Sequence, residues 1–174
     1  PLNVNKLGVT YVHEHLMVKP QLPDEYYIPY TLDDEAASTE ETRSFSAAGG
    51  ETLVEMTPIN YGRNVKAYQR IAQATGVHVI CCTGFHKQLF MPPWFGDKTD
   101  GELYDILMDE VTNGLDDTEI HPGVIKLGTS FEEVTVAEKR SIEAVARVHR
   151  DTGIPISTHC DKGTMGMDQL RLLE

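Results

Sequence analysis

The sequence predicts an α/β fold built around a parallel sheet, and three observations support this class. Strand-like and helix-like segments alternate five times along the 174 residues. The strand-like segments are continuous apolar runs, as expected when both faces of a sheet are covered. Several helix-like segments end in a glycine directly before the next strand, which is the usual position of a left-handed cap. Repeated strand–helix–strand units of this kind build a parallel sheet.

The individual elements follow from local patterns. Strands are predicted at residues 9–15, 51–57, 77–83, 123–128 and 154–159, and helices at 33–48, 64–75, 99–113, 135–152 and 165–174. Thr99 with Glu102, and Thr135 with Glu138, have the spacing of capping boxes and mark two helix starts. The segment 18–32 contains Pro20, Pro23 and Pro29, and this proline density predicts a loop rather than a long helix.

Composition and charge restrict the function classes. With 15 basic and 27 acidic residues, the net charge of −12 argues against nucleic acid or an anionic membrane surface as a partner. The longest apolar runs, such as 77–82, are too short to span a bilayer. Cys81, Cys82 and Cys160 have no spacing that indicates a disulfide framework, so we expect reduced thiols and a cytoplasmic location. The sequence leaves the oligomeric state open, with a homodimer as one option.

The first strand ends in a pair of histidines, His13 and His15. Side chains two residues apart project from the same face of a strand, so two imidazoles would lie side by side. Such a pair can chelate a divalent metal. In the alternative reading, one histidine is a hydrogen-bonded core residue and the other is solvated. For an isolated pair the two readings carry equal weight.

Lys126 lies in the fourth strand, within Val-Ile-Lys-Leu-Gly, where its neighbours are predicted to be buried. Burial lowers the pKa of a lysine, and a neutral amine can add carbon dioxide to form a carbamate. A carbamate has two oxygens and could bridge two metal ions. Alternatively, the stem is buried and the ammonium reaches solvent at the strand end, which the strand alone favours. His13, His15 and a third histidine at a strand end, His159, reverse that preference.

These polar residues also decide between two parallel architectures. A doubly wound sheet collects its ligands mainly at one switch point. A closed barrel instead gathers the carboxyl ends of strands one, four and five around one pocket, and His13, His15, Lys126 and His159 lie near such ends. We therefore predict a (β/α)₈ TIM barrel, which typically takes about 250 residues. Residues 1–174 would form a single partial barrel domain of five βα units. Because only five of the eight units of such a barrel are present, we expect roughly three more units on the C-terminal side. The start at Pro1 and not at methionine also indicates that the sequence is not the whole gene product.

Several motifs, in order along essentially the whole chain, carry a family resemblance. They are Gly8-Val9-Thr10, His13-Glu14-His15, Gly62-Arg63-Asn64, Thr83-Gly84, Gly123-Val124-Ile125-Lys126, Gly128-Thr129-Ser130 and Pro155-Ile156-Ser157-Thr158-His159. Together they resemble the phosphotriesterase family of the amidohydrolase superfamily. The resemblance is closer to the phosphotriesterase-homology and lactonase branches than to the phosphotriesterases proper.

The resemblance implies a barrel hydrolase with two divalent metal ions, commonly zinc. His13 and His15 would bind the more buried metal, Lys126 as a carbamate would bridge both, and His159 would bind the more exposed one. The family's further histidine and its catalytic aspartate would lie beyond Glu174, so no catalytic residue is assigned within this sequence. The implied mechanism is attack by a metal-bridging hydroxide on a small-molecule ester: a lactone, a carboxylic ester or a phosphotriester.

Two further residues are candidates near the site. His86 follows the third strand where lactonase relatives often carry tyrosine, which suggests a pocket for a polar or anionic substrate. The competing and favoured reading of His86 is an ordinary solvated loop histidine. Glu55 lies in an apolar strand and could orient a ligand histidine from behind. A structural ion pair, with Arg63 as the partner, explains Glu55 equally well.

Two other functions compete with the ester hydrolase. A metal-dependent deoxyribonuclease of the same superfamily also opens with His-x-His, but such enzymes usually have glutamate where Lys126 stands. The negative charge of the chain also disfavours a nucleic-acid substrate. The second rival is a non-catalytic binding protein on the barrel scaffold, since a fold does not fix a function.

Overall fold

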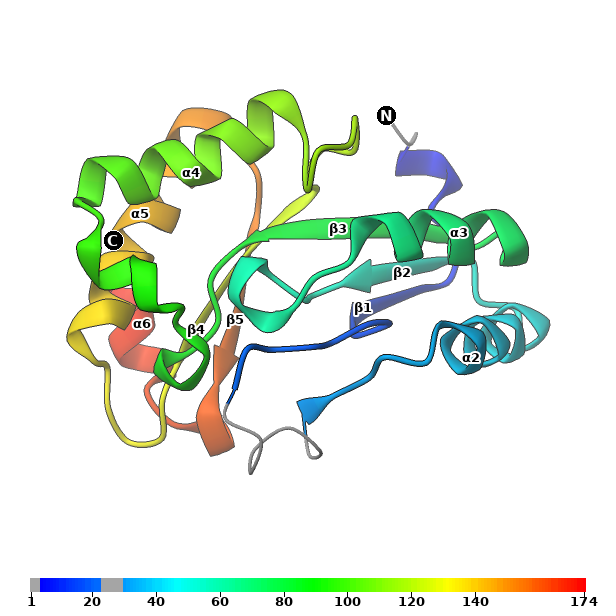
Figure 1. The fold of residues 1–174 in the computed structure, drawn as a ribbon, viewed down its shortest axis with the longest axis horizontal. Helices are drawn as coiled ribbons and strands as arrows, with labels where there is room; N and C mark the ends of the chain where they lie inside the picture. The colour runs from blue at the N-terminus through cyan, green and yellow to red at the C-terminus, as the bar shows by residue number, and fades with distance from the viewer. Residues whose placement is uncertain (1–3, 23–29) are drawn as a thin grey trace.

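The structure is a computed structural model that describes residues 4–22 and 30–174 (Figure 1). Its centre is one parallel sheet in the order β1-β2-β3-β4-β5. The strands are β1 (Thr10–Glu14), β2 (Thr52–Glu55), β3 (His78–Gly84), β4 (Val124–Thr129) and β5 (Ile156–Cys160). The sheet turns along its length, so that β4 and β5 run steeply across the direction of β1 to β3 in this view. A sequential order without reversal belongs to a half-barrel and not to a doubly wound sheet, which confirms the predicted fold class.

A helix follows each strand. These are α2 (Glu35–Ala47), α3 (Val65–Thr75), α4 (Asp100–Asn113), α5 (Val136–Thr152) and α6 (Gly166–Leu173). Both predicted capping boxes are present, at Thr99–Glu102 and Thr135–Glu138. Short 3₁₀ helices interrupt the loops, among them η3 (Ile59–Tyr61), η4 (Gln88–Phe90), η5 (Pro93–Asp97) and η6 (Asp161–Gly163). A further 3₁₀ turn, Val4–Lys6, precedes β1.

Element boundaries differ from the predictions by a few residues. β2 ends at Glu55 rather than at residue 57, because the Glu55 carboxylate accepts the backbone N–H groups of Leu16 and Thr57. In the predicted loop 18–32, Val18 and Leu32 form an isolated antiparallel bridge. Residues 23–29 of that loop, with Pro23 and Pro29, lie outside the described residues.

Two large groups of buried apolar side chains hold the helices against the sheet, and a third, smaller group consists of Met56, Cys82 and Val124. The N-terminal cluster includes Leu16, Met17, Leu53, Tyr68, Ile71 and Cys81. The C-terminal cluster includes Phe85, Phe95, Leu103, Ile125, Leu127, Ile142 and Val145. β3 contributes to the first cluster at Cys81, and Phe85 directly after its end belongs to the second.

β1 departs from the predicted burial on both faces. Tyr11 and Val12 are 56% and 73% exposed. The reason is position, because β1 is an edge of the sheet and pairs only with β2 among the described strands. The cysteines behave as predicted: Cys81 and Cys82 are buried, Cys160 is half-buried and all three are free thiols. Within the described ranges, no helix is both long and apolar enough to cross a membrane.

Gly84 permits the close approach of β3 and β4 that positions Lys126. Its φ is +109°, a backbone conformation that residues other than glycine rarely adopt. A Cβ atom built on Gly84 would lie 2.0 Å from the backbone oxygen of Lys126. That same oxygen accepts the N–H of Phe85 at 3.1 Å. Glycine is therefore required where the third strand passes the lysine.

Candidate functional site

The three predicted histidine ligands lie at the carboxyl ends of β1 and β5, whereas Lys126 lies within β4, three residues before its end. His13 is in β1 and His15 directly follows it, with their ring centroids 5.3 Å apart. Lys126 Nζ is 3.2 Å from His13 Nε2, although β1 and β4 are not neighbours in the sheet. His159, in β5, is close enough to Lys126 for the lysine's charge to lower the histidine's pKa. Curvature of the sheet thus gathers these residues, as the barrel prediction requires.

Lys126 is fully buried, so its ammonium does not reach solvent at the strand end. In register it stands between Gly84 of β3 and Ser157 of β5. Burial lowers the pKa of Lys126 to about 8, against weaker opposing effects from Cys82 and other groups. A lysine with this pKa has an appreciable fraction of neutral, nucleophilic amine near neutral pH. The reading of a snorkelling lysine is therefore wrong for this residue.

The three histidines are held in their neutral form. Burial, and then the charge of Lys126, lowers the pKa of His13 to about 4 and that of His15 to about 3. The pKa of His159 is lowered for the same two reasons, in the same order. A neutral imidazole keeps one ring nitrogen with a free lone pair, which is the form that binds metal.

His15 is oriented from behind by a threonine. Its Nδ1 lies 2.8 Å from Thr57 Oγ1 and 3.9 Å from Glu55 Oε1. Buried Glu55 itself accepts hydrogen bonds from Leu16 N at 2.5 Å and Thr57 N at 2.8 Å. Burial raises the pKa of Glu55 to about 7, and these hydrogen bonds oppose the rise. Glu55 thus fixes the backbone on both sides of the His15–Thr57 contact.

The alternative ion pair between Glu55 and Arg63 is wrong. Arg63 instead pairs with Glu110 and Asp116, its Nη2 lying 2.5 Å and 2.6 Å from their carboxylates. Arg63 also donates to the backbone oxygen of Cys82. This network fixes the loop after β2 to β3 and α4, away from the histidines.

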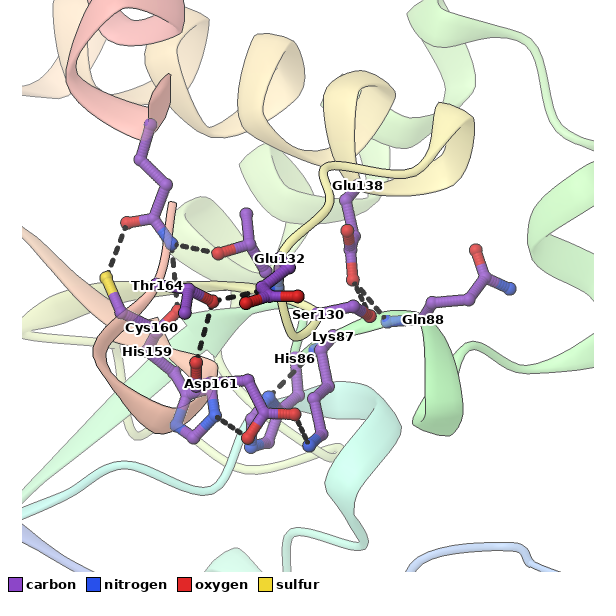
Figure 2. Close-up of polar contacts among 12 residues, drawn as sticks. His86, Lys87, Gln88, Ser130, Glu132, Glu138, His159, Cys160, Asp161 and Thr164 are labelled. Carbon is purple, nitrogen blue, oxygen red and sulfur yellow. Dashed lines mark hydrogen bonds and ion pairs between the residues drawn. The ribbon is translucent and has the colours of Figure 1, made fainter. Parts of the chain in front are cut away.

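His86 is buried, at 4% exposure, which excludes the reading of a solvated loop histidine. Its ring centroid lies 4.5 Å from that of His159, 4.7 Å from Tyr61 and 4.9 Å from Phe90. Figure 2 shows His86 beside His159 at the ends of their strands. The Nδ1 atom of His86 accepts the N–H of Lys87 at 2.8 Å, and this leaves Nε2 as its outward nitrogen.

Several residues of the site escaped the sequence analysis. Tyr61 packs edge-on between His15 and His86, with centroid distances of 5.4 Å and 4.7 Å. The one sequence feature that could have indicated Tyr61 is its position directly before the Gly62-Arg63-Asn64 motif. Lys87 and Asp161 form an ion pair of 2.6 Å that links the loops after β3 and β5 (Figure 2). No local pattern could reveal this pair, because it depends on how two loops 74 residues apart meet.

The donor set fits divalent metal ions. The Nε2 atom of His159 is buried and has no hydrogen-bond partner in the described part of the chain, the state expected of a ligand atom. In residues 4–22 and 30–174, no three His, Cys, Asp or Glu side chains are gathered tightly enough to hold a metal by themselves. Lys126 is outside those four residue types, and as a carbamate it would add two oxygen donors beside His13.

The fold and this site define a class of protein. Consecutive βα units whose carboxyl ends bring three neutral histidines around a buried lysine form one half of a (β/α)₈ barrel with a polar centre. The model of the Phosphotriesterase family matches residues 1–174. The chain belongs to this family, as the motifs predicted.

Relatives with known names agree. The phosphotriesterase homology protein of Escherichia coli (strain K12) is 33% identical over 174 residues, covering 99% of this chain and 59% of that protein. A phospho-furanose lactonase of Mycoplasmopsis synoviae (strain 53) is 32% identical over 181 residues, covering 95% and 51%. The chain therefore spans between half and three fifths of the length of these relatives.

Solved structures of the family share the fold. The crystal structure of the Escherichia coli phosphotriesterase homology protein, complexed with phosphate in its active site, superposes with a TM-score of 0.90 at 34% identity. The superposition covers 97% of this chain and 58% of the Escherichia coli chain. A lactonase from Listeria monocytogenes also gives a TM-score of 0.90, at 32% identity, covering 97% and 57%.

Proposed function

We propose that the protein is a metal-dependent hydrolase of small-molecule esters, with lactones as the first substrate class to test. The observation that carries this proposal is the buried Lys126 amine, 3.2 Å from His13, among histidines that are held neutral. The names of the relatives support hydrolysis of lactones and phosphotriesters as the chemistry of the family.

The proposed roles follow from the donors. His13 and His15 would hold the more buried cation and His159 the more exposed one, with Lys126 between them as a carbamate. Carbamate formation joins the amine nitrogen to the carbon of carbon dioxide and releases a proton, so it needs the neutral amine that burial favours. Two bound divalent cations, with zinc as the first candidate, would polarise the ester carbonyl and lower the pKa of a bound water.

The remaining side chains would shape the pocket. Thr57 and Glu55 fix the position of His15, and Tyr61 shields its ring from water. His86, with Lys87 and Asp161 at the mouth, would give the pocket a polar wall suited to the ring oxygens or an anionic group of a substrate. A small, polar cytoplasmic metabolite fits this wall better than a polymer.

The test is a comparison of metal content and hydrolysis in the intact protein. We expect about two divalent metals per chain, and we expect hydrolysis to be fastest on a lactone in a panel that also contains a carboxylic ester and a phosphotriester. A chelator should abolish hydrolysis, and Zn²⁺ should restore it. If the protein binds metal but hydrolyses no member of the panel, the result supports a binding protein. If it cleaves DNA and no ester, the result supports the deoxyribonuclease. Protein that binds no metal would overturn the proposal.

Thr57→Val is expected to weaken metal binding without unfolding the protein. The substitution keeps the shape of the side chain but removes the hydroxyl that lies 2.8 Å from His15 Nδ1. Loss of a group that orients a ligand typically costs about 10- to 100-fold in metal affinity. Competition with a chromophoric chelator measures the change. Thr39→Val is the control, since the Thr39 hydroxyl donates to the backbone oxygen of Glu35 within α2, away from the histidines. Equal affinities in both variants would contradict the proposed role.

A further inference from the structure

Glu138, near the start of α5, has more partners than a helix cap requires. Its Oε2 accepts the N–H of Thr135 at 2.8 Å, which completes the capping box. Its Oε1 accepts two further hydrogen bonds, from Gln88 N at 2.8 Å and from Ser130 Oγ at 2.6 Å. Figure 2 shows the carboxylate of Glu138 pointing to Gln88 and Ser130, which lie in the loops after β3 and β4.

The other capping box of the chain shows what a cap alone looks like. Glu102 of α4 is exposed, and it accepts hydrogen bonds from Thr99 of its own helix start and from Lys98 beside it. Glu138 is fully buried. Burying a carboxylate is costly unless donors satisfy it. A glutamate that only caps a helix would therefore gain nothing from being buried. The burial of Glu138 therefore serves the two loop contacts.

One of these loops leads directly to the proposed pocket. Gln88 follows His86 and Lys87 in sequence, and its N–H is fixed by Glu138. On the pocket side, Lys87 reaches Asp161 at 2.6 Å, and the His86 ring lies 4.5 Å from His159. The segment 86–88 is thus held at Gln88 by Glu138 and at Lys87 by Asp161. Asn60 accepts the backbone N–H of His86 at 2.6 Å.

We propose that Glu138 is a positioning residue that sets His86 and Lys87 against the carboxyl end of β5. The loop after β3 has little regular structure, since only the short helices η4 and η5 lie between β3 and α4. By holding both this loop and the loop after β4, the Glu138 carboxylate makes the segment around η4 more rigid. The inference rests on the proposed function only in treating His86 and Lys87 as part of a pocket.

The test compares Glu138→Gln with Glu102→Gln in the intact protein, without substrate or metal. The glutamine keeps the volume of the side chain but has one accepting oxygen in place of two, so it can no longer accept both the Thr135 N–H and the Gln88 N–H. A hydrogen bond to a charged group contributes about 1.5–3 kcal/mol, which corresponds to about 10- to 100-fold in a local opening equilibrium. We expect the Gln88 amide to exchange faster by that factor in Glu138→Gln, and not in Glu102→Gln.

A second readout reports on the pocket itself. In Glu138→Gln the imidazole NMR signals of His86 and His159 should shift, while in Glu102→Gln they should not. Gln88→Pro covers the case in which Glu138→Gln fails to fold. It removes the N–H that Glu138 accepts and the Gln88 oxygen that accepts the Thr135 hydroxyl, but it keeps both capping-box bonds between Thr135 and Glu138. It places proline at the first position of η4, where it is tolerated.

The outcomes separate this inference from the proposed hydrolase. Shifted histidine signals in Glu138→Gln or Gln88→Pro support positioning by Glu138 even if no ester is hydrolysed. If Glu138→Gln and Glu102→Gln behave alike, or if neither Glu138→Gln nor Gln88→Pro moves the histidine signals, Glu138 is only a helix cap and the inference is overturned.

Discussion

Lys126→Ala is expected to lose at least one of two metals per chain and to reduce ester hydrolysis by about a thousandfold or more. The lysine is fully buried, so alanine leaves a space beside His13 with no group that can replace the donor. Each bound cation contributes several kcal/mol to the stabilisation of charge in the transition state, and a loss of about 4 kcal/mol corresponds to that factor. Metal analysis and initial rates on the preferred ester measure the two effects.

Lys139→Ala is the matched control, because Lys139 lies exposed on α5. The carbamate has a direct signature: protein prepared with ¹³C-bicarbonate should show a carbamate carbon resonance that Lys126→Ala lacks and Lys139→Ala retains. The signal should grow as the pH rises through about 8, the pKa to which burial lowers Lys126, because only the neutral amine reacts. Unchanged metal content and activity in Lys126→Ala would refute the assignment.

Arg63→Met is expected to lower the free energy of unfolding by about 3–5 kcal/mol, the usual effect of removing one partner from a buried ion pair. The Arg63 side chain is 3% exposed and the Glu110 side chain 14%. Methionine retains an apolar stem but leaves Glu110 with Thr83 Oγ1, at 2.6 Å, as its nearest remaining donor. Urea denaturation measures the change.

Arg70→Met provides the comparison for Arg63→Met. Arg70 makes a similar two-pronged contact with Glu35, at 2.7 Å for both nitrogens, but the two side chains are 56% and 36% exposed. Because water screens an exposed pair, we expect Arg70→Met to lose much less stability than Arg63→Met. If the two variants lost equal stability, burial would not be the origin of the effect, and the network around Arg63 would be only a surface contact.

Most of the architecture could be predicted because its signals are local. Glycines after helices, two capping boxes and apolar runs each depend on a few neighbouring residues, and α4, α5 and β4 lie close to their predicted positions. The failures are at β1 and at the end of β2. The exposure of β1 depends on what lies next to an edge strand, and β2 ends early because a side chain competes with the strand's hydrogen bonds.

A residue of the site could be predicted from the sequence where its polar side chain is unusual in an apolar strand. Lys126 in an apolar run is such a residue, and its burial is confirmed. Thr57, Tyr61 and Asp161 are ordinary residues at loop positions, and their importance comes from side chains that approach from distant segments. The metal-ligand roles of His13, His15, Lys126 and His159, and the roles of His86 and Glu55, stay predictions for the experiments above.

The two large apolar clusters have a mechanical consequence for the pair of His13 and Lys126. Leu16 and Met17, just after His15, anchor the end of β1 in the N-terminal cluster, whereas Ile125 and Leu127 anchor β4 in the C-terminal cluster. The 3.2 Å between the imidazole and the amine therefore depends on side chains packed in two different clusters, although the strands themselves are joined in one sheet. A substitution deep in either cluster, far from any polar group, is therefore expected to change that distance.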